Sequence, residues 1–78
     1  MKTLLITGAS TGFGRALAQE ALSRGHQVAL AVRNPESVGD LVQEFPIKAH
    51  AIPFDLTKPE DAARSVSETV TRFGSLDV

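Results

Sequence analysis

Short apolar runs alternate with segments of helical periodicity along this chain. Three runs, at residues 2–6, 27–32 and 49–54, consist largely of apolar residues, as expected of strands covered on both faces. After each run, apolar positions recur at the three- and four-residue spacing of a helix. The alternation predicts an α/β fold, in which helices connect the strands of a parallel sheet.

The first two predicted helices have recognisable ends. The first begins at Gly12 or Phe13 and ends at Arg24, because Gly25 is a typical C-terminal stop. A short second helix begins at Pro35, whose ring suits a first helical turn. The positions expected to face inward are Phe13, Ala16, Leu17, Ala21 and Leu22 in the first helix and Val38, Leu41, Val42 and Phe45 in the second.

A third helix is predicted to begin at Thr57 through a capping box. In this motif the Thr57 hydroxyl accepts from an amide of the first turn, while Glu60 reaches back to the Thr57 amide. Gly74 is expected to end the helix. Its inward positions are predicted to be Ala62, Ala63, Val66, Val70 and Phe73.

A glycine-rich segment, Thr7–Gly14, lies between the first predicted strand and the first predicted helix. This is the context in which a glycine loop binds a dinucleotide. Gly8 is expected to allow a sharp turn, Gly12 a close approach of the backbone to a diphosphate, and Gly14 tight packing of the helix on the sheet. A tight glycine turn that binds no ligand is the alternative.

The residues around the second glycine supply donors for a bound phosphate. The amides of Gly12 and Phe13 stand at a predicted helix N-terminus, where free N–H groups and the helix dipole favour anions. Ser10 and Thr11 add hydroxyl donors. A nucleoside triphosphate loop fits less well, because Gly14 is not followed by Lys and then Ser or Thr.

Pro53 indicates how the strands are ordered. Proline lacks the amide proton that a central strand needs, so the third strand is expected at an edge, in the order 3-2-1. Residues 76–78 resemble the start of a fourth strand, where the sequence stops. We therefore expect a Rossmann-type βαβαβα unit, truncated at the start of strand 4. On this reading, residues 1–78 form the N-terminal dinucleotide-binding portion of one incomplete domain.

Composition narrows the classes of partner. The 78 residues are 42% hydrophobic and carry a net charge of -1, which gives no basic cluster for nucleic acid. There is no cysteine, which excludes thiolate metal sites and fits a cytoplasmic location. His26 and His50 lack companion ligands at metal spacing, so no metal site is expected. The apolar run at residues 1–6 is too short for a signal peptide or a membrane span.

Three motifs together resemble the short-chain dehydrogenase/reductase (SDR) family. The spacing Gly-x-x-x-Gly-x-Gly after Thr7 is that family's pattern, and residues 74–78 resemble its entry into the fourth strand. Asp55-Leu56 resembles its adenine-contacting pair. The resemblance implies that Asp55 accepts a hydrogen bond from the adenine amino group and that Leu56 covers the ring. A plain turn or cap role for Asp55 is the alternative.

The end of the second strand indicates which nicotinamide cofactor binds. Val32 aligns with the acidic residue that would bind the ribose diol of NAD(H). Arg33 and Asn34 follow, and a guanidinium can bind a 2′-phosphate through charge-assisted hydrogen bonds. We therefore predict NADP(H) over NAD(H), with Arg15 as a second candidate for the same phosphate. An ordinary solvated arginine at position 33 is the alternative.

The family's catalytic segments are not in this sequence. There is no Asn-Asn-Ala-Gly segment and no Tyr-x-x-x-Lys pair, and the chain contains no tyrosine. The resemblance thus implies the cofactor-binding part of an oxidoreductase that transfers hydride between nicotinamide and a carbonyl or alcohol. We expect no catalytic residue here, and a small-molecule substrate only in the full-length protein. The alternative is a non-catalytic nucleotide-binding or interaction module of native length, which forms a homo-oligomer through the exposed edge at residues 4–6.

Overall fold

The computed structural model describes the whole chain, Met1–Val78. In chain order its elements are β1 (Thr3–Thr7), α1 (Gly12–Ser23), β2 (Gln27–Val32), the 3₁₀ turn η1 (Pro35–Val38), α2 (Gly39–Glu44), β3 (Ala49–Pro53) and α3 (Pro59–Phe73). The strands form one parallel sheet in the order β1-β2-β3. The predicted α/β fold is confirmed, and Pro53 stands at the end of an edge strand.

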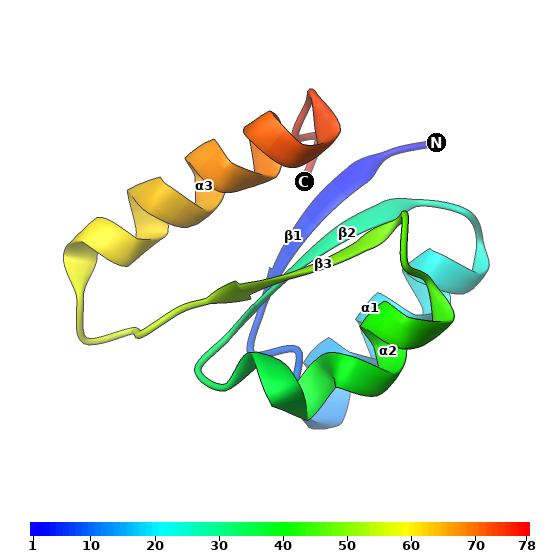
Figure 1. Cartoon of the computed structure of the whole chain (residues 1–78), viewed down its shortest axis with the longest axis horizontal. Helices are drawn as coiled ribbons and strands as arrows, with labels where there is room; N and C mark the ends of the chain where they lie inside the picture. The colour runs from blue at the N-terminus through cyan, green and yellow to red at the C-terminus, as the bar shows by residue number, and fades with distance from the viewer.

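Helices cover both faces of the sheet. α1 and α2 lie on one face, and α3 lies on the other (Figure 1). The register pairs Thr7 with Ala31 and Val32 with Pro53, so the carboxyl ends of the three strands lie together. The loops that follow parallel strands meet at this edge, which is where ligands bind in folds of this kind.

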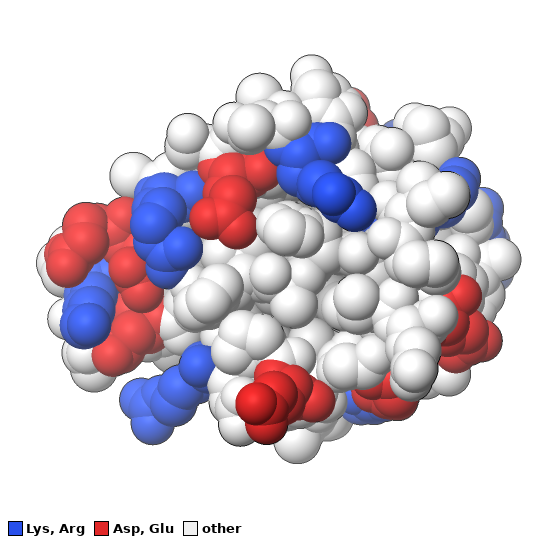
Figure 2. All heavy atoms as spheres, viewed as in Figure 1, with Lys and Arg blue, Asp and Glu red and all other residues white.

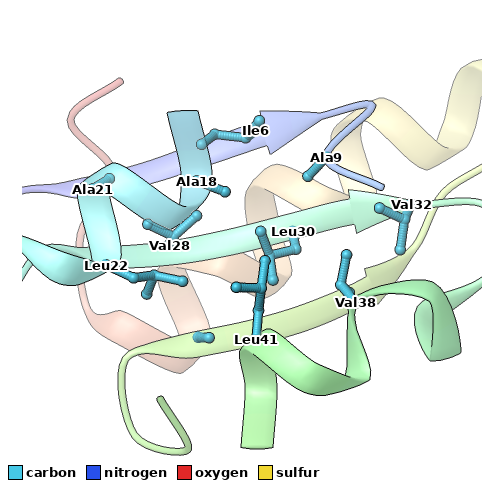
Figure 3. Close-up of a cluster of buried hydrophobic side chains, with 11 residues drawn as sticks. Ile6, Ala9, Ala18, Ala21, Leu22, Val28, Leu30, Val32, Val38 and Leu41 are labelled. Carbon is cyan, nitrogen blue, oxygen red and sulfur yellow. The ribbon is translucent and has the colours of Figure 1, made fainter. Parts of the chain in front are cut away.

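The core fills the layer between the sheet and the helices α1 and α2. Leu30 of β2 and Leu41 of α2 point toward one another, and Val32 lies near Val38 of η1 (Figure 3). Each such buried side chain contributes about 1.5–3 kcal/mol to folding. The inward prediction is confirmed for Val38 and Leu41. The cluster is completed by Ile6, Ala9, Ala18, Ala21, Leu22, Val28 and Ala49, with Val42 and Phe45 partly buried against it.

α1 turns a different face to the sheet from the predicted one. The buried residues are Ala18, Ala21 and Leu22, whereas exposed positions include Phe13, Ala16 and Leu17. The cause is Gly14, which lies against the Gly8 carbonyl and so fixes the rotation of the helix about its axis. The face through positions 18, 21 and 22 therefore meets the sheet. The inward prediction is confirmed for Ala21 and Leu22 and is wrong for positions 13, 16 and 17.

α3 also contradicts its predicted inward face. Val66 and Val70 are 44% and 42% exposed, while Ser65 and Thr69 are buried. The Ser65 hydroxyl donates to the Ala62 carbonyl (2.9 Å), and the Thr69 hydroxyl donates to the Ser65 carbonyl (2.7 Å). Both hydroxyls are thus satisfied inside the helix, so these side chains can be buried without loss of hydrogen bonds. Of the predicted inward set, Ala62, Ala63, Val66 and Val70 are exposed, and only Phe73 is half-buried.

The capping box predicted at Thr57 does not form. α3 begins at Pro59, with Lys58 as N-cap and no side-chain cap bond. The Thr57 amide and hydroxyl both donate to the Asp55 carboxylate, at 2.9 and 2.7 Å. The Thr57 amide is thus engaged by Asp55, two residues earlier, and is not available to Glu60 as the capping box requires.

The last residues of the chain cover part of the free edge of β1. The Leu5 amide donates to the Val78 carbonyl (2.8 Å), and the amides of Asp77 and Val78 donate to the Thr3 carbonyl (2.8 and 3.2 Å). The Asp77 carboxylate accepts from the Thr3 amide (2.8 Å). These bonds place residues 77–78 beside β1, but the sheet has three strands and the predicted fourth strand is not formed. They also occupy part of the edge on which the predicted homo-oligomer depends.

Charges of both signs are spread over the surface. On the face shown in Figure 2, basic and acidic side chains mix along α3, and the area over the sheet is mainly uncharged. This face has no single-sign patch that would attract a polyanion. None of the helices is long and apolar enough to cross a membrane.

Candidate functional site

The glycine loop joins β1 to α1 at the carboxyl edge of the sheet. Gly8 and Gly12 have φ values of +66° and +60°, a region that residues with a Cβ rarely adopt. An added Cβ would meet nothing within 4 Å at either position. Backbone conformation, and not crowding, therefore requires these two glycines. The Gly8 amide donates to the Ala31 carbonyl (3.2 Å), which ties the loop to the end of β2.

A glycine is required at position 14 because the helix backbone there lies very close to the backbone of the glycine loop. A Cβ at this position would collide with the Gly8 carbonyl oxygen, lie 3.0 Å from its carbon and lie 3.3 Å from the Ala9 Cα. All three atoms belong to the backbone, so no side chain can move aside. Gly14 thus packs the first turn of α1 on the glycine loop, whereas the sequence predicted packing on the sheet.

The first amides of α1 have no partner in the helix. The helix begins at Gly12, and the extended Thr11 before it makes no side-chain cap. The Arg15 amide is the first to reach back, to the Thr11 carbonyl at 3.4 Å. The three amides at positions 12–14 are therefore available to an external acceptor. Together with the positive end of the helix dipole, they form a suitable site for a phosphate.

A cavity of about 300 Å³ lies across the carboxyl ends of the strands. Small-molecule sites span roughly 300–1,000 Å³, so this cavity suits one part of a dinucleotide. Its lining residues are Thr7, Gly8, Ser10, Ala31, Val32, Arg33, Phe54 and Leu56. Four predicted site residues are brought together here, namely Gly8, Ser10, Arg33 and Leu56. Six others do not line the cavity, namely Thr11, Gly12, Phe13, Gly14, Asn34 and Asp55.

Arg33 is an exposed cation at the cavity. Its guanidinium makes no ion pair with the protein, and no carboxylate lines the cavity. The neighbouring Asn34 is engaged in the turn. Its side chain accepts from the Glu36 amide (3.2 Å), and its carbonyl accepts from the amide (2.9 Å) and hydroxyl (2.6 Å) of Ser37. Asn34 therefore shapes the turn that presents Arg33.

Arg15 is already paired. It forms an ion pair with Asp40 and donates to the Ser37 carbonyl (3.4 Å), which ties α1 to η1 and α2. The hydrogen bond from Arg15 is the main reason that the pKa of Asp40 lies below its usual value. The second candidate for the 2′-phosphate is thus engaged elsewhere, and Arg33 is the unpaired arginine at the cavity.

Asp55 organises the turn between β3 and α3. One oxygen of its carboxylate accepts from the hydroxyl (2.7 Å) and the amide (2.9 Å) of Thr57. These bonds, the hydroxyl's first, hold the pKa of Asp55 below its usual value, with a smaller contribution from the positive charge of Arg33. Asp55 is therefore ionised at neutral pH. Leu56, which follows it, lines the cavity and is 83% exposed.

Sequence reasoning did not identify Asp61 as part of this region. Its carboxylate accepts from the Asp55 amide (2.8 Å) and lies 3.3 Å from the Arg64 guanidinium. Arg64 also donates to the Pro53 carbonyl. The signal in the sequence was an acidic residue at the third position of a helix, from which a carboxylate can reach back to free amides. The sequence does not show which amide it reaches.

Known proteins share this sequence pattern. The profile of the short chain dehydrogenase family matches residues 2–78, and the chain belongs to this family. The 11-beta-hydroxysteroid dehydrogenase 1A of Arabidopsis thaliana is 41% identical over 97% of this chain and 23% of its own length. The sorbitol dehydrogenase of Cereibacter sphaeroides is 39% identical over 99% of this chain and 30% of its own length.

Solved structures share the fold. A short-chain dehydrogenase from Streptomyces avermitilis has a TM-score of 0.92 at 39% identity, over 99% of this chain and 29% of that one. The 3-ketoacyl-(acyl-carrier-protein) reductase of Brucella melitensis, solved in complex with NADH, has a TM-score of 0.87 at 30% identity. That match covers 97% of this chain and 31% of the reductase. The chain therefore spans less than a third of the length of these four relatives.

Proposed function

We propose that this chain binds the adenosine and diphosphate half of NADP(H), as the N-terminal dinucleotide-binding portion (residues 1–78) of a single Rossmann domain. The observation that carries the proposal is the cavity at the carboxyl edge of the sheet. It connects the glycine loop to the unpaired Arg33. A diphosphate and a 2′-phosphate are anionic groups at two separate points of one cofactor, and each has a matching positive partner here.

The diphosphate is assigned to the start of α1. The free amides at positions 12–14 donate to its oxygens, and the Ser10 hydroxyl at the cavity wall adds a donor. The positive φ values of Gly8 and Gly12 give the loop its bends. The contact between Gly14 and Gly8 brings the helix start up to the loop. The Thr11 hydroxyl and the Phe13 amide are assigned to the same phosphate site.

The 2′-phosphate is assigned to Arg33. In dinucleotide-binding folds, a carboxylate near the end of β2 selects the free ribose diol, and an arginine accommodates the phosphate. Here the cavity contains Val32 and Arg33 at that place and no acidic side chain. The Brucella melitensis relative was solved with NADH. Membership of the family therefore does not by itself favour NADP(H), and the proposal depends on Val32 and Arg33 of this chain.

The proposed reaction is that of the family. The nicotinamide supplies hydride chemistry with a carbonyl or alcohol of a small-molecule substrate, and this segment binds and orients the cofactor. Asp55 and Leu56 are assigned to the adenine ring. Because the family's Tyr-x-x-x-Lys pair is not in this sequence, we expect binding without turnover by the 78-residue chain. A cytoplasmic location stays a prediction.

Calorimetric titration of the chain with NADPH and with NADH tests the proposal. Tighter binding of NADPH, by about tenfold, is expected from charge-assisted hydrogen bonds to one phosphate. Equal affinities would refute the assignment of the 2′-phosphate to Arg33. If neither cofactor binds, the proposed function is refuted. A reductase assay on the same sample should show no turnover.

A further inference from the structure

We propose that Asp61 is a positioning residue for adenine recognition, which acts by holding the backbone of Asp55 in place. The inference rests on the proposed cofactor function. It adds a residue on α3 that does not line the cavity. This residue determines how strongly the site prefers adenine over hypoxanthine. The turn at residues 54–57, which connects β3 to α3, transmits the effect.

The turn is held from both sides by carboxylates. At its start, the Asp55 amide donates to the Asp61 carboxylate at 2.8 Å. At its end, the Thr57 amide and hydroxyl donate to the carboxylate of Asp55 itself. Asp55 is therefore fixed at its backbone by Asp61 and at its side chain by Thr57. Phe54 and Leu56, which flank Asp55, both line the cavity.

Asp61 is well placed to act as a rigid support. Its side chain is only 13% exposed, so water competes weakly for its oxygens. Its second oxygen lies 3.3 Å from Arg64, which is also bonded to the Pro53 carbonyl. The end of β3 and the first turns of α3 are thus linked by a continuous set of hydrogen bonds. Without Asp61, the Asp55 amide loses its acceptor and the turn loses its fixed start.

The consequence is a difference in specificity and not only in affinity. On the proposed function, Asp55 accepts from the amino group of adenine, a group that hypoxanthine lacks. A fixed Asp55 should favour NADPH over nicotinamide hypoxanthine dinucleotide phosphate by roughly tenfold, the value of one hydrogen bond to a charged group. If Asp55 is mobile, the chain should bind the two dinucleotides with similar affinity. A variant that is merely less stable would bind both dinucleotides less well and keep their ratio.

The test compares Asp61→Ala with Glu60→Ala, a matched control in the same turn of α3. Glu60 is exposed and also lies near the helix N-terminus, so its loss removes the same charge from the helix dipole. Calorimetry with both dinucleotides should show the adenine preference falling from about tenfold to near one in Asp61→Ala and unchanged in Glu60→Ala. An unchanged preference in Asp61→Ala would overturn the inference.

Asp61→Asn keeps one acceptor oxygen for the Asp55 amide and should restore most of the preference. If the asparagine variant behaves like the alanine variant, charge and not the hydrogen bond is responsible, and the inference is overturned. If Asp61→Ala does not fold, amide exchange in the unaltered chain decides. The Asp55 amide should exchange at least tenfold more slowly than the Leu56 amide, which has no such acceptor, and equal rates would contradict the role of Asp61.

These outcomes are separable from failure of the proposed function. If the unaltered chain does not bind NADPH, the cofactor assignment fails and the inference fails with it. If it binds NADPH through Arg33 but does not distinguish adenine from hypoxanthine, only the role given to Asp55 and Asp61 fails.

Discussion

At the glycine loop the backbone itself forms the proposed diphosphate site, whereas at the end of β3 side chains form the proposed adenine site. The loop depends on two residues with positive φ and on a contact at Gly14 that leaves no room for a Cβ. The turn at residues 54–57 depends on carboxylates and their donors. The two regions lie at one edge of the sheet but are specified in different ways.

The difference predicts how each region responds to substitution. Backbone geometry cannot be altered at the loop without moving α1, so changes there should affect folding and binding together. The side chains proposed to bind the adenosine end contribute little to the core. Changes there should alter which nucleotide binds and leave the fold intact.

Gly14→Ala should have the largest effect. The new Cβ collides with backbone atoms of Gly8, so we expect a loss of about 3 kcal/mol in unfolding free energy, at the upper end for overpacking. Denaturant unfolding followed by circular dichroism measures it. Gly39→Ala is the matched control, because its added Cβ meets nothing and its φ of -58° is helical. It should be neutral or stabilise by up to about 1 kcal/mol. Equal effects of the two changes would refute a steric role for Gly14.

Arg33→Ala should weaken binding of 2′,5′-ADP about tenfold and leave 5′-AMP unchanged, because only the former has a 2′-phosphate. The unfolding free energy should not change, since Arg33 has no ion pair with the protein. Arg24→Ala removes an equally charged, exposed side chain at the C-cap of α1 and serves as control. A similar loss in both variants would mean that net charge, and not a local contact, attracts the nucleotide.

Thr57→Val should raise the pKa of Asp55 toward its ordinary value of 3.8, because the Thr57 hydroxyl is the main cause of the lowering. The lowered pKa means that Asp55 contributes stability above its unfolded pKa and loses this contribution as pH falls through the folded value. An NMR titration of the Asp55 side chain below pH 5 measures the shift. Thr71→Val, at an exposed position of α3, should leave the pKa of Asp55 unchanged. No change in Thr57→Val would show that the bond is absent in solution.

The preference for NADPH over NADH should decrease several-fold between pH 7.5 and pH 5.5. The second pKa of a phosphate monoester lies near 6, so the 2′-phosphate loses charge over this interval. The pKa of Asp55 lies below 3.8 and should not contribute. Arg33→Ala should show little pH dependence in the cofactor ratio. A ratio that stays constant with pH in the unaltered chain would argue against an ionic contact to this phosphate.

The sequence predicted those features that depend on local periodicity and on residues with special backbone behaviour. The strand at residues 27–32 has the bounds expected from its apolar run. The glycine loop lies where the motif placed it, and Pro53 correctly indicated an edge strand. In the last two cases, a residue type restricts the backbone whatever its neighbours are.

Features that depend on tertiary contacts were not predicted. The face that α1 presents to the sheet is set by the contact of Gly14 with the loop, so Phe13 and Leu17 are exposed although they are apolar. α3 buries Ser65 and Thr69, because their hydroxyls bond within the helix. Asp61 reaches an amide six residues earlier in the chain, and its position in the first turn of α3 does not show which amide it reaches.

The central claim is that the loop amides and Arg33 hold one cofactor between them. A titration of the ¹⁵N-labelled chain with NADPH, followed through its amide resonances, tests this most directly. We predict saturable shifts at Ser10, Gly12 and Phe13 together with Arg33, all with one dissociation constant. Absent shifts at the loop, or shifts confined to α3 or the free edge of β1, would contradict the account.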